Sequence, residues 1–176
     1  MKEQKIAVIG FGIWGRNIVR NFYNLNVLDT VCDLDEESLK TVKEQFPGVN
    51  VTKDFKDIIN NKEITGVAVV TPSHTHFKMV KAMLEACKNV YVEKPISTVA
   101  DEAKVLTDLA EEKGLVLMVD HLLLYHPAVN RLKMLIEEGV LGELVYAQSD
   151  RLNVNYHKND RSVMWDLAPH DVSMIA

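Results

Sequence analysis

The sequence predicts an α/β fold, a doubly wound parallel sheet followed by the incomplete start of a second α/β domain. Short apolar runs without polar alternation occur at 6–9, 27–31, 67–70 and 90–92, and such runs are typical of strands that helices cover on both faces. Segments with helical periodicity lie between them, which indicates a parallel sheet. We expect residues 1–120 to form the first domain and residues 121–176 to begin the second.

Apolar residues at helical spacing predict helices over 13–22, 39–46 and 77–84. Ser73 or Thr75 is the expected N-cap of the third. Asp54 should begin a further short helix that reaches residue 59.

The later helices and strand are predicted from residues that typically begin or end a helix. Thr98 is the expected N-cap of a helix over 99–112, which Lys113-Gly114 should end. A strand is expected next, at 115–119. Pro127 is well placed to begin a helix that reaches Glu138 and ends at Gly139.

Two expectations concern the end of the chain. Residues 144–149 are expected to form a strand, and residues 164–176 to begin a packed helix. This last segment stops without a cap or a polar tail, which favours a second domain cut short.

Composition narrows the class of function. The formal net charge of -5 carries no basic stripe, so neither nucleic acid nor a membrane surface is the expected partner. The N-terminus has no signal-peptide pattern, and no apolar stretch reaches the about 18 residues that span a bilayer; we expect a cytoplasmic protein. Cys32 and Cys87 are too few for a disulfide framework or a metal cluster, and are interpreted as packing residues.

The most informative stretch follows the first predicted strand. Gly10-Phe11-Gly12-Ile13-Trp14-Gly15 has the spacing G-x-G-x-x-G between a strand and a helix, which predicts a Rossmann-type turn that binds a dinucleotide pyrophosphate. Gly10 permits the turn, Gly12 lets the backbone approach the phosphates, and Gly15 lets the helix pack on the strand. The alternative is that the three glycines form a tight turn that binds no nucleotide.

Asp33 follows the second predicted strand, where a carboxylate would accept hydrogen bonds from the adenosine ribose and repel a 2'-phosphate. NAD is therefore favoured over NADP. The alternative for Asp33 is a helix N-cap, a role that Asp35 can fill instead.

Two further motifs follow predicted strands, and loops at those ends line the ligand crevice of a parallel sheet. In Thr71-Pro72-Ser73-His74-Thr75-His76 we expect Thr71, Pro72 and His76 to contact the cofactor. In Glu93-Lys94-Pro95 the lysine can donate to a substrate oxygen and act in catalysis, and we expect Glu93 and Lys94 also to contact the cofactor. A helix cap and a surface ion pair, respectively, are the alternatives.

Asp166 and His170 lie four residues apart, so on a helix both side chains share one face and the carboxylate can orient the imidazole as a general base. Pro169 complicates this prediction, because it suits only the first turn of a helix or a kink.

Together, these motifs resemble the glucose-fructose oxidoreductase/inositol dehydrogenase (Gfo/Idh/MocA) family. The resemblance implies an NAD(P)-binding Rossmann domain and a second domain that carries most of the substrate site. It implies that Lys94 and His170 flank the reacting hydroxyl, with Asp166 in support and either the lysine or the histidine as base. The implied substrate is a sugar, cyclitol or nucleotide sugar, and the implied full-length form associates as a homo-oligomer.

Residues 120–128 and 148–153 look most like the branch that oxidises UDP-N-acetylated hexoses or hexuronic acids at C3. The implied substrate contacts are Arg151, Asn153, Tyr156 and His157, although a solvated loop would have the same composition. Full members are about twice as long as this chain. A non-catalytic NAD-binding sensor or assembly subunit, a fragment that binds NAD without turnover, and an enzyme acting on a non-sugar carbonyl remain alternatives.

Overall fold

The computed structural model describes residues 4–151 and 162–176, which fall into two compact units, Met1–Asp120 and His121–Ala176. Each unit is described by itself below.

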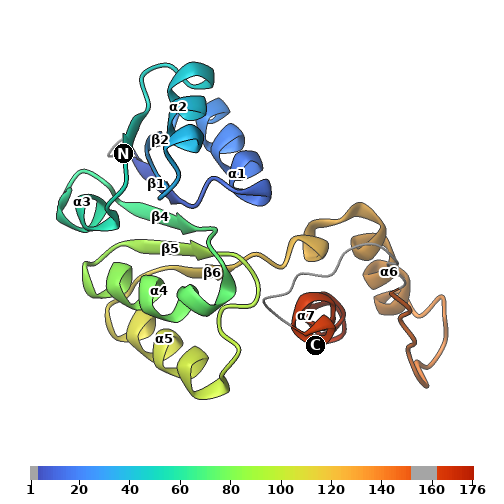
Figure 1. Cartoon of the computed structure of the whole chain (residues 1–176). Coiled ribbons are helices and arrows are strands. Elements are labelled where there is room, and N and C mark those ends of the chain that lie inside the picture. The colour runs from blue at the N-terminus through green and yellow to red at the C-terminus, as the bar shows by residue number, and fades with distance from the viewer. Residues whose placement is uncertain (1–3, 152–161) are drawn as a thin grey trace. The chain divides into compact units, whose positions relative to one another are not determined.

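The first unit contains a parallel sheet of six strands in the order β3-β2-β1-β4-β5-β6 (Figure 1). The strands are β1 (Ile6–Ile9), β2 (Leu28–Cys32), β3 (Asn50–Thr52), β4 (Gly66–Val69), β5 (Asn89–Val92) and β6 (Leu117–Val119). This order confirms the predicted doubly wound fold. The sequence runs from β1 outward through β2 and β3, then crosses to β4 on the other side of β1, so the strand order reverses between β1 and β4.

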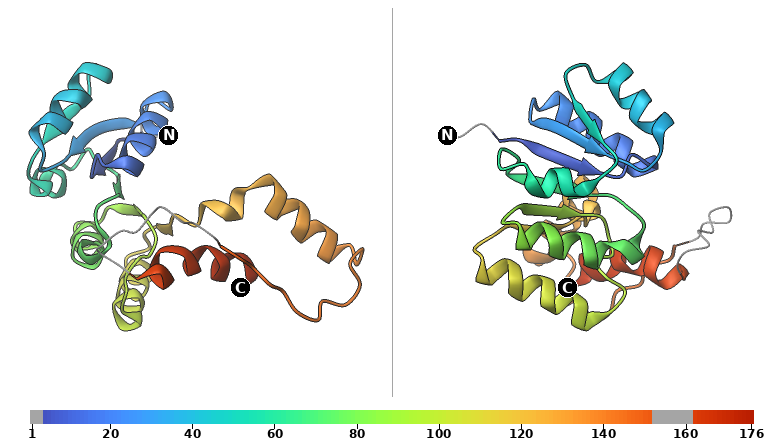
Figure 2. Two further views of the ribbon diagram at one scale, coloured as in Figure 1. Left: turned by 45° about the vertical axis from the view of Figure 1, so that its right-hand side comes forward. Right: turned by 60° about the vertical axis from the view of Figure 1, so that its left-hand side comes forward.

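Helices cover both faces of this sheet. They are α1 (Ile13–Asn24), α2 (Glu36–Gln45), α3 (Phe55–Asn60), α4 (His76–Glu85) and α5 (Ala100–Glu112). Neighbouring residues of a strand point to opposite faces. Val8 of β1 accordingly packs in one core cluster with residues of α1 and α2, and Ile9 packs in the other with residues of α3, α4 and α5. Figures 1 and 2 show α4 and α5 side by side.

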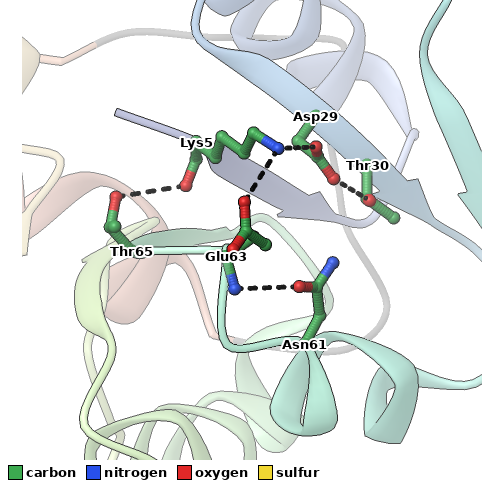
Figure 3. Close-up of polar contacts among 6 residues, drawn as sticks. All are labelled: Lys5, Asp29, Thr30, Asn61, Glu63 and Thr65. Carbon is green, nitrogen blue, oxygen red and sulfur yellow. Dashed lines mark hydrogen bonds and ion pairs between the residues drawn. The ribbon is translucent and has the colours of Figure 1, made fainter. Parts of the chain in front are cut away.

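A polar cluster lies where β1, β2 and β4 begin. The Lys5 ammonium lies 3.3 Å from the Glu63 carboxylate and 3.9 Å from that of Asp29, and the Thr65 hydroxyl donates to the Lys5 carbonyl (Figure 3). These contacts join the amino ends of the three strands. The ends at which a parallel sheet binds ligands are the opposite, carboxyl ends.

Several predicted helix boundaries are confirmed. Asp35 caps α2 by accepting from the Ser38 N–H, Asp54 caps α3, and Lys113 ends α5. One predicted cap is wrong. The N-cap of α5 is Val99, and the nearby hydroxyl that accepts its N–H belongs to Ser97 instead of Thr98.

Thr75, one of the two expected caps of α4, is its N-cap residue, but its side chain makes no capping hydrogen bond. Ser73–Thr75 form a short 3-10 turn that runs directly into the helix. The Thr75 hydroxyl donates to the Pro72 carbonyl at 2.7 Å, so it is engaged within the turn.

The second unit contains a 3-10 turn at Leu122–Tyr125 and two helices, α6 (Pro127–Glu137) and α7 (Val163–Ile175). The helix predicted to begin at Pro127 is confirmed, and His126 caps it by accepting from the Ala128 N–H. The strand predicted at 144–149 is wrong. The structure assigns no strand to these residues, and Leu144, Val145 and Tyr146 are exposed, because no segment of the described chain pairs with them.

No helix within residues 4–151 and 162–176 is both long enough and apolar enough to cross a membrane. In the same residues, no group of three or more His, Cys, Asp or Glu side chains is placed to hold a metal ion.

Candidate functional site

The glycine turn joins the end of β1 to the start of α1, and two of its glycines are required by close backbone approaches. Gly10 has φ +100°, and a Cβ there would lie 2.5 Å from the Val70 carbonyl oxygen. A Cβ on Gly15 would lie 2.1 Å from the Gly10 carbonyl oxygen. Any larger residue at Gly15 would push α1 away from the turn, as the motif predicts.

Gly12 differs from both. It is the N-cap of α1, and a Cβ there would meet nothing within 4 Å. Ile13 and Trp14 follow it in the first helical turn, and both side chains are substantially exposed although they are apolar. The turn therefore presents open space, bordered by exposed apolar side chains, directly before a helix N-terminus.

The N-terminus of α1 has the chemistry of an anion site. The first helical bond runs from the Arg16 N–H to the Gly12 carbonyl at 3.1 Å, so the N–H groups of the residues before Arg16 belong to the unpaired first turn of the helix. Such groups, together with the positive end of the helix dipole, favour phosphate. The Arg16 guanidinium lies 5.3 Å from the centre of the Phe11 ring.

Asp33 is tied to this turn. Its Oδ2 accepts from the Phe11 N–H at 2.6 Å and its Oδ1 accepts from the Asp35 N–H at 2.9 Å. A carboxylate has about four acceptor positions in all, so ribose hydroxyls can still donate to it. Because Asp35 is the cap of α2, the helix-cap alternative for Asp33 is not needed.

The two loops that follow β4 and β5 are linked by His76. Its side chain is 1% exposed, with Nδ1 2.8 Å from the Pro95 carbonyl oxygen and Nε2 2.8 Å from the Thr71 carbonyl oxygen. A carbonyl oxygen only accepts, so both contacts are hydrogen bonds when both ring nitrogens carry protons. The contact of His76 with the cofactor stays a prediction; what the structure shows is that His76 holds the two loops together.

The rest of the first loop is turned partly inward. The Thr71 and Thr75 hydroxyls lie 2.6 Å apart, whereas Pro72 is exposed. Contacts of Thr71 and Pro72 with a cofactor remain predictions.

Glu93 and Lys94 follow β5. Glu93 is 8% exposed, and the Lys94 side chain is half-buried. Burial, the charge of Asp120 and a side-chain hydrogen bond with Asp120 together raise the pKa of Glu93 from its ordinary value of 4.5 to about 7, against the lowering effect of Lys94. The alternative of an exposed surface pair does not describe Glu93, because this side chain is buried beside a second carboxyl.

Sequence reasoning gave Asp120 no role. It is 9% exposed and follows β6, the strand next to β5. The available signal was an acidic residue directly after an apolar strand, the same signal that drew attention to Glu93.

Asp166 and His170 both belong to α7, so the structure places them four residues apart on one helix. Ser162 caps this helix and Pro169 lies inside it. The helix begins before Pro169 and continues through it, so Asp166 is helical, and the expected helix over 164–176 is confirmed. Lys94 lies in the first unit and these two residues lie in the second, so their joint role stays a prediction.

Of the four predicted substrate contacts, only Arg151 lies in the described chain. Its Nε donates to both carboxylate oxygens of Asp171 at 2.8 Å, and the Ser149 hydroxyl donates to the same carboxylate. These bonds lower the pKa of Asp171 and tie residues 149–151 to α7. Asn153, Tyr156 and His157 lie outside the described residues.

The geometry of the first unit fits a dinucleotide. The space next to Gly12 is open, because a Cβ there would meet nothing within 4 Å. The N–H groups of the first turn of α1 can donate to a pyrophosphate. The Asp33 carboxylate, just after β2, is bonded to the same turn. The residues that would hold the cofactor are therefore Gly10, Gly12, Gly15 and Asp33, with Ile13 and Trp14 beside them.

Comparisons with known proteins agree with this geometry. The Gfo/Idh/MocA family model, described as an oxidoreductase family with an NAD-binding Rossmann fold, matches residues 4–121. The scyllo-inositol 2-dehydrogenase (NADP(+)) IolW of Bacillus subtilis (strain 168) is 29% identical over 168 residues, which cover 93% of this chain and 46% of the relative.

A UDP-N-acetylglucosamine 3-dehydrogenase of Acidithiobacillus ferrooxidans is 28% identical over 180 residues, covering 99% of this chain and 54% of the relative. Among solved structures, the scyllo-inositol dehydrogenase from Lactobacillus casei with bound NAD(H) and scyllo-inositol has a TM-score of 0.82 at 20% identity, covering 99% of this chain and 55% of that one. The chain thus spans about half the length of the curated relatives it matches.

Proposed function

The chain belongs to the Gfo/Idh/MocA family of oxidoreductases with an NAD-binding Rossmann fold, and from that premise we propose that it binds NAD at the glycine turn and forms part of a dehydrogenase. The proposed reaction is oxidation of a secondary hydroxyl of a sugar, cyclitol or UDP-sugar. The observation that supports it most directly is the glycine turn, whose open space at Gly12 adjoins the Asp33 carboxylate.

NAD is the proposed cofactor in preference to NADP. The Asp33 carboxylate lies at the glycine turn, where it accepts two backbone hydrogen bonds. Its negative charge would repel a 2'-phosphate. The NADP(+)-dependent relative shows that the family uses both cofactors, so this preference is a property to be measured in this chain.

Lys94 is the proposed catalytic residue of the first unit. It follows β5 at the carboxyl edge of the sheet, where the crevice of such folds lies. Its ammonium can donate a hydrogen bond to the reacting oxygen and stabilise the negative charge that develops as the hydroxyl loses its proton. Bound NAD would supply the hydride acceptor.

His170, with Asp166 in support, is the proposed partner of Lys94 in the proton transfer. The two residues share a helix at a spacing that brings their side chains to one face. Either the lysine or the histidine can be the base, and the pH dependence of turnover in single variants would separate them.

We further propose a UDP-N-acetylated hexose or hexuronic acid, oxidised at C3, as the substrate class to test first. The similarity to a UDP-N-acetylglucosamine 3-dehydrogenase along 99% of the chain supports this order of testing. Arg151 and the predicted contacts Asn153, Tyr156 and His157 would serve this substrate.

The test is NAD reduction, followed by absorbance, with a panel of inositols, hexoses and UDP-N-acetylhexosamines. It should use the chain and, if the coding region continues in frame, the longer product. Lys94→Ala should remove most turnover while NAD affinity stays nearly unchanged, because the lysine faces the substrate oxygen. Equal loss of turnover and NAD affinity would refute the role of Lys94, and normal binding without turnover on every substrate would favour a non-catalytic NAD-binding subunit.

A further inference from the structure

We propose that Glu93 and Asp120 form a carboxyl pair that shares one proton beside the nicotinamide end of the cofactor site, and that loss of this proton strengthens the preference for NAD+ over NADH. This inference rests on the proposed binding of NAD. It adds a pH-dependent control of the cofactor's oxidation state and gives Asp120 a role as a positioning residue.

Strand register places the two carboxyls together. Strands β5 and β6 are parallel and pair Val92 with Val119 at their carboxyl ends. Glu93 and Asp120 are the residues that directly follow this pair. The Asp120 N–H donates to the Val92 carbonyl at 2.8 Å, and the Glu93 N–H donates to the Val69 carbonyl at 3.0 Å, so both backbones are held at the sheet edge. Neighbouring parallel strands lie about 4.8 Å apart, a spacing at which two carboxyl side chains can share a proton.

Burial makes two negative charges at this point unfavourable. Glu93 and Asp120 are 8% and 9% exposed. When two carboxyl groups share a buried site, they cannot both lose their protons at the ordinary pKa of a carboxyl group. The raised pKa of Glu93, to about 7, agrees with this geometry. The titration of Glu93 is therefore expected to depend on Asp120.

Within residues 4–120, the charged groups to consider beside the pair are Lys94 and the ionisable side chains of the neighbouring strands and helices. Lys94, from the same loop as Glu93, is the cation that acts on it. Strands β4 and β6, on either side of β5, contain no ionisable residue. On α4, which packs against β5, the buried ionisable side chain is His76, which contacts the Pro95 carbonyl, and on α5 the Glu102 carboxylate accepts from the Ser97 hydroxyl.

The position of Glu93 and Asp120 in the sheet indicates which end of the bound cofactor would lie beside them. A Rossmann sheet is built from two mononucleotide-binding halves that meet where the strand order reverses. The glycine turn and Asp33 belong to the half formed by β1 to β3, which takes the adenosine end. Glu93 and Asp120 directly follow β5 and β6 in the other half, where the nicotinamide would lie.

The electrostatic consequence has a definite sign. The nicotinamide ring carries a positive charge in NAD+ and none in NADH. A pair that has lost its proton carries one more negative charge, which stabilises the positive ring and leaves the neutral ring almost unaffected. By linkage, the affinity for NAD+ then rises with pH by at most about tenfold per pH unit, while the affinity for NADH stays nearly constant.

Infrared spectroscopy tests the shared proton without any cofactor. The wild-type chain at pH 6 should show the carbonyl stretch of a buried protonated carboxylic acid, which fades as the pH approaches 8.5. Glu93→Gln should remove this band, and Glu112→Gln, which changes an exposed carboxylate on α5, should retain it. A wild-type spectrum at pH 6 without the band would overturn the pair.

Cofactor titrations test the consequence. Between pH 6 and 8.5 the ratio of the NADH dissociation constant to the NAD+ dissociation constant should rise about five- to tenfold in the wild type and in Glu112→Gln. In Glu93→Gln the carboxyl with the raised pKa is absent, so the ratio should stay flat across this range. In Asp120→Asn the charge that helps to raise the pKa of Glu93 is removed while burial remains, so the rise of the ratio should move to lower pH.

The outcomes separate this inference from the proposed function. A pH-dependent ratio that persists in Glu93→Gln, or a rise that does not move to lower pH in Asp120→Asn, would overturn the role of the pair while leaving NAD binding intact. Failure of the chain to bind either form, with the infrared band present, would overturn the proposed function and with it the redox preference.

Discussion

The Asp33 carboxylate accepts a hydrogen bond from the Phe11 backbone N–H, with 2.6 Å between Oδ2 and the nitrogen. This bond joins the end of β2 to the middle of the glycine turn. The acidic residue proposed to bind the ribose therefore also fixes the backbone proposed to bind the pyrophosphate. One side chain couples the two halves of the adenosine-end site.

Asp33→Asn should lower NAD affinity about tenfold, because a charge-assisted acceptor for the ribose is lost. It should also narrow the difference between NAD and NADP, since the repulsive charge is removed. Titration calorimetry with both cofactors checks this. Asp35→Asn is the matched control: it removes the same charge two residues away and keeps a good N-cap, so any equal effect in the control would count against the ribose role of Asp33.

Gly15→Ala and Gly12→Ala should separate folding from binding. A Cβ at Gly15 would lie 2.1 Å from a backbone oxygen, so this substitution should lower the free energy of unfolding by about 3 kcal/mol. A Cβ at Gly12 meets nothing within 4 Å, so stability should change by about 1 kcal/mol or less while NAD affinity falls tenfold or more, by roughly 1.4 kcal/mol. Urea unfolding and NAD titration of both variants check this, and wild-type affinity in Gly12→Ala would refute the site.

The free energy of unfolding should fall as the pH rises from the ordinary pKa of Glu93 to its pKa in the fold. Its pKa is 4.5 ordinarily and about 7 in the fold, so between these values the folded chain binds more protons than the unfolded chain. The stabilisation is complete below pH 4.5 and is lost as the pH rises to about 7, an effect on the order of 3 kcal/mol. Urea unfolding of the wild type and Glu93→Gln from pH 5 to 8 measures it, and parallel pH profiles for the two proteins would contradict it.

The two cysteines should differ sharply in reactivity. Cys32 is buried in β2, and burial together with the charge of Asp33 raises its pKa to about 12, so at pH 8 it stays an inert thiol. Cys87 is exposed, which corrects the interpretation of both cysteines as packing residues. A thiol reagent should label one cysteine rapidly in the native chain and the second only on unfolding; Cys87→Ser should lose the rapid reaction, and fast labelling of that variant would contradict the burial argument.

What the sequence predicted well depends on local chemistry. The glycine spacing, the Asp35 and Asp54 caps and the helix start at Pro127 each follow from a few neighbouring residues. The parallel sheet followed from the alternation of apolar runs and helical stripes. The short strand β3 lies outside those runs, because Asn50–Thr52 contains a single strongly apolar residue.

What could not be predicted depends on neighbours distant in the sequence. The Glu93 and Asp120 pair requires the register of β5 against β6. The link from His76 to Thr71 and Pro95 requires α4 to dock beside two loops. Residues 144–149 have the apolar content of a strand, yet a strand also needs a partner, and composition does not supply one.

The central claim, an NAD site at the glycine turn, is tested most directly by titrating the chain with NAD+ and NADP+ under the same conditions. We predict saturable binding of one NAD+ per chain, displaced by NADH, with weaker binding of NADP+ and loss of affinity in Gly12→Ala. Failure of the folded wild-type chain to bind NAD+, or equal binding by the wild type and Gly12→Ala, would contradict the claim.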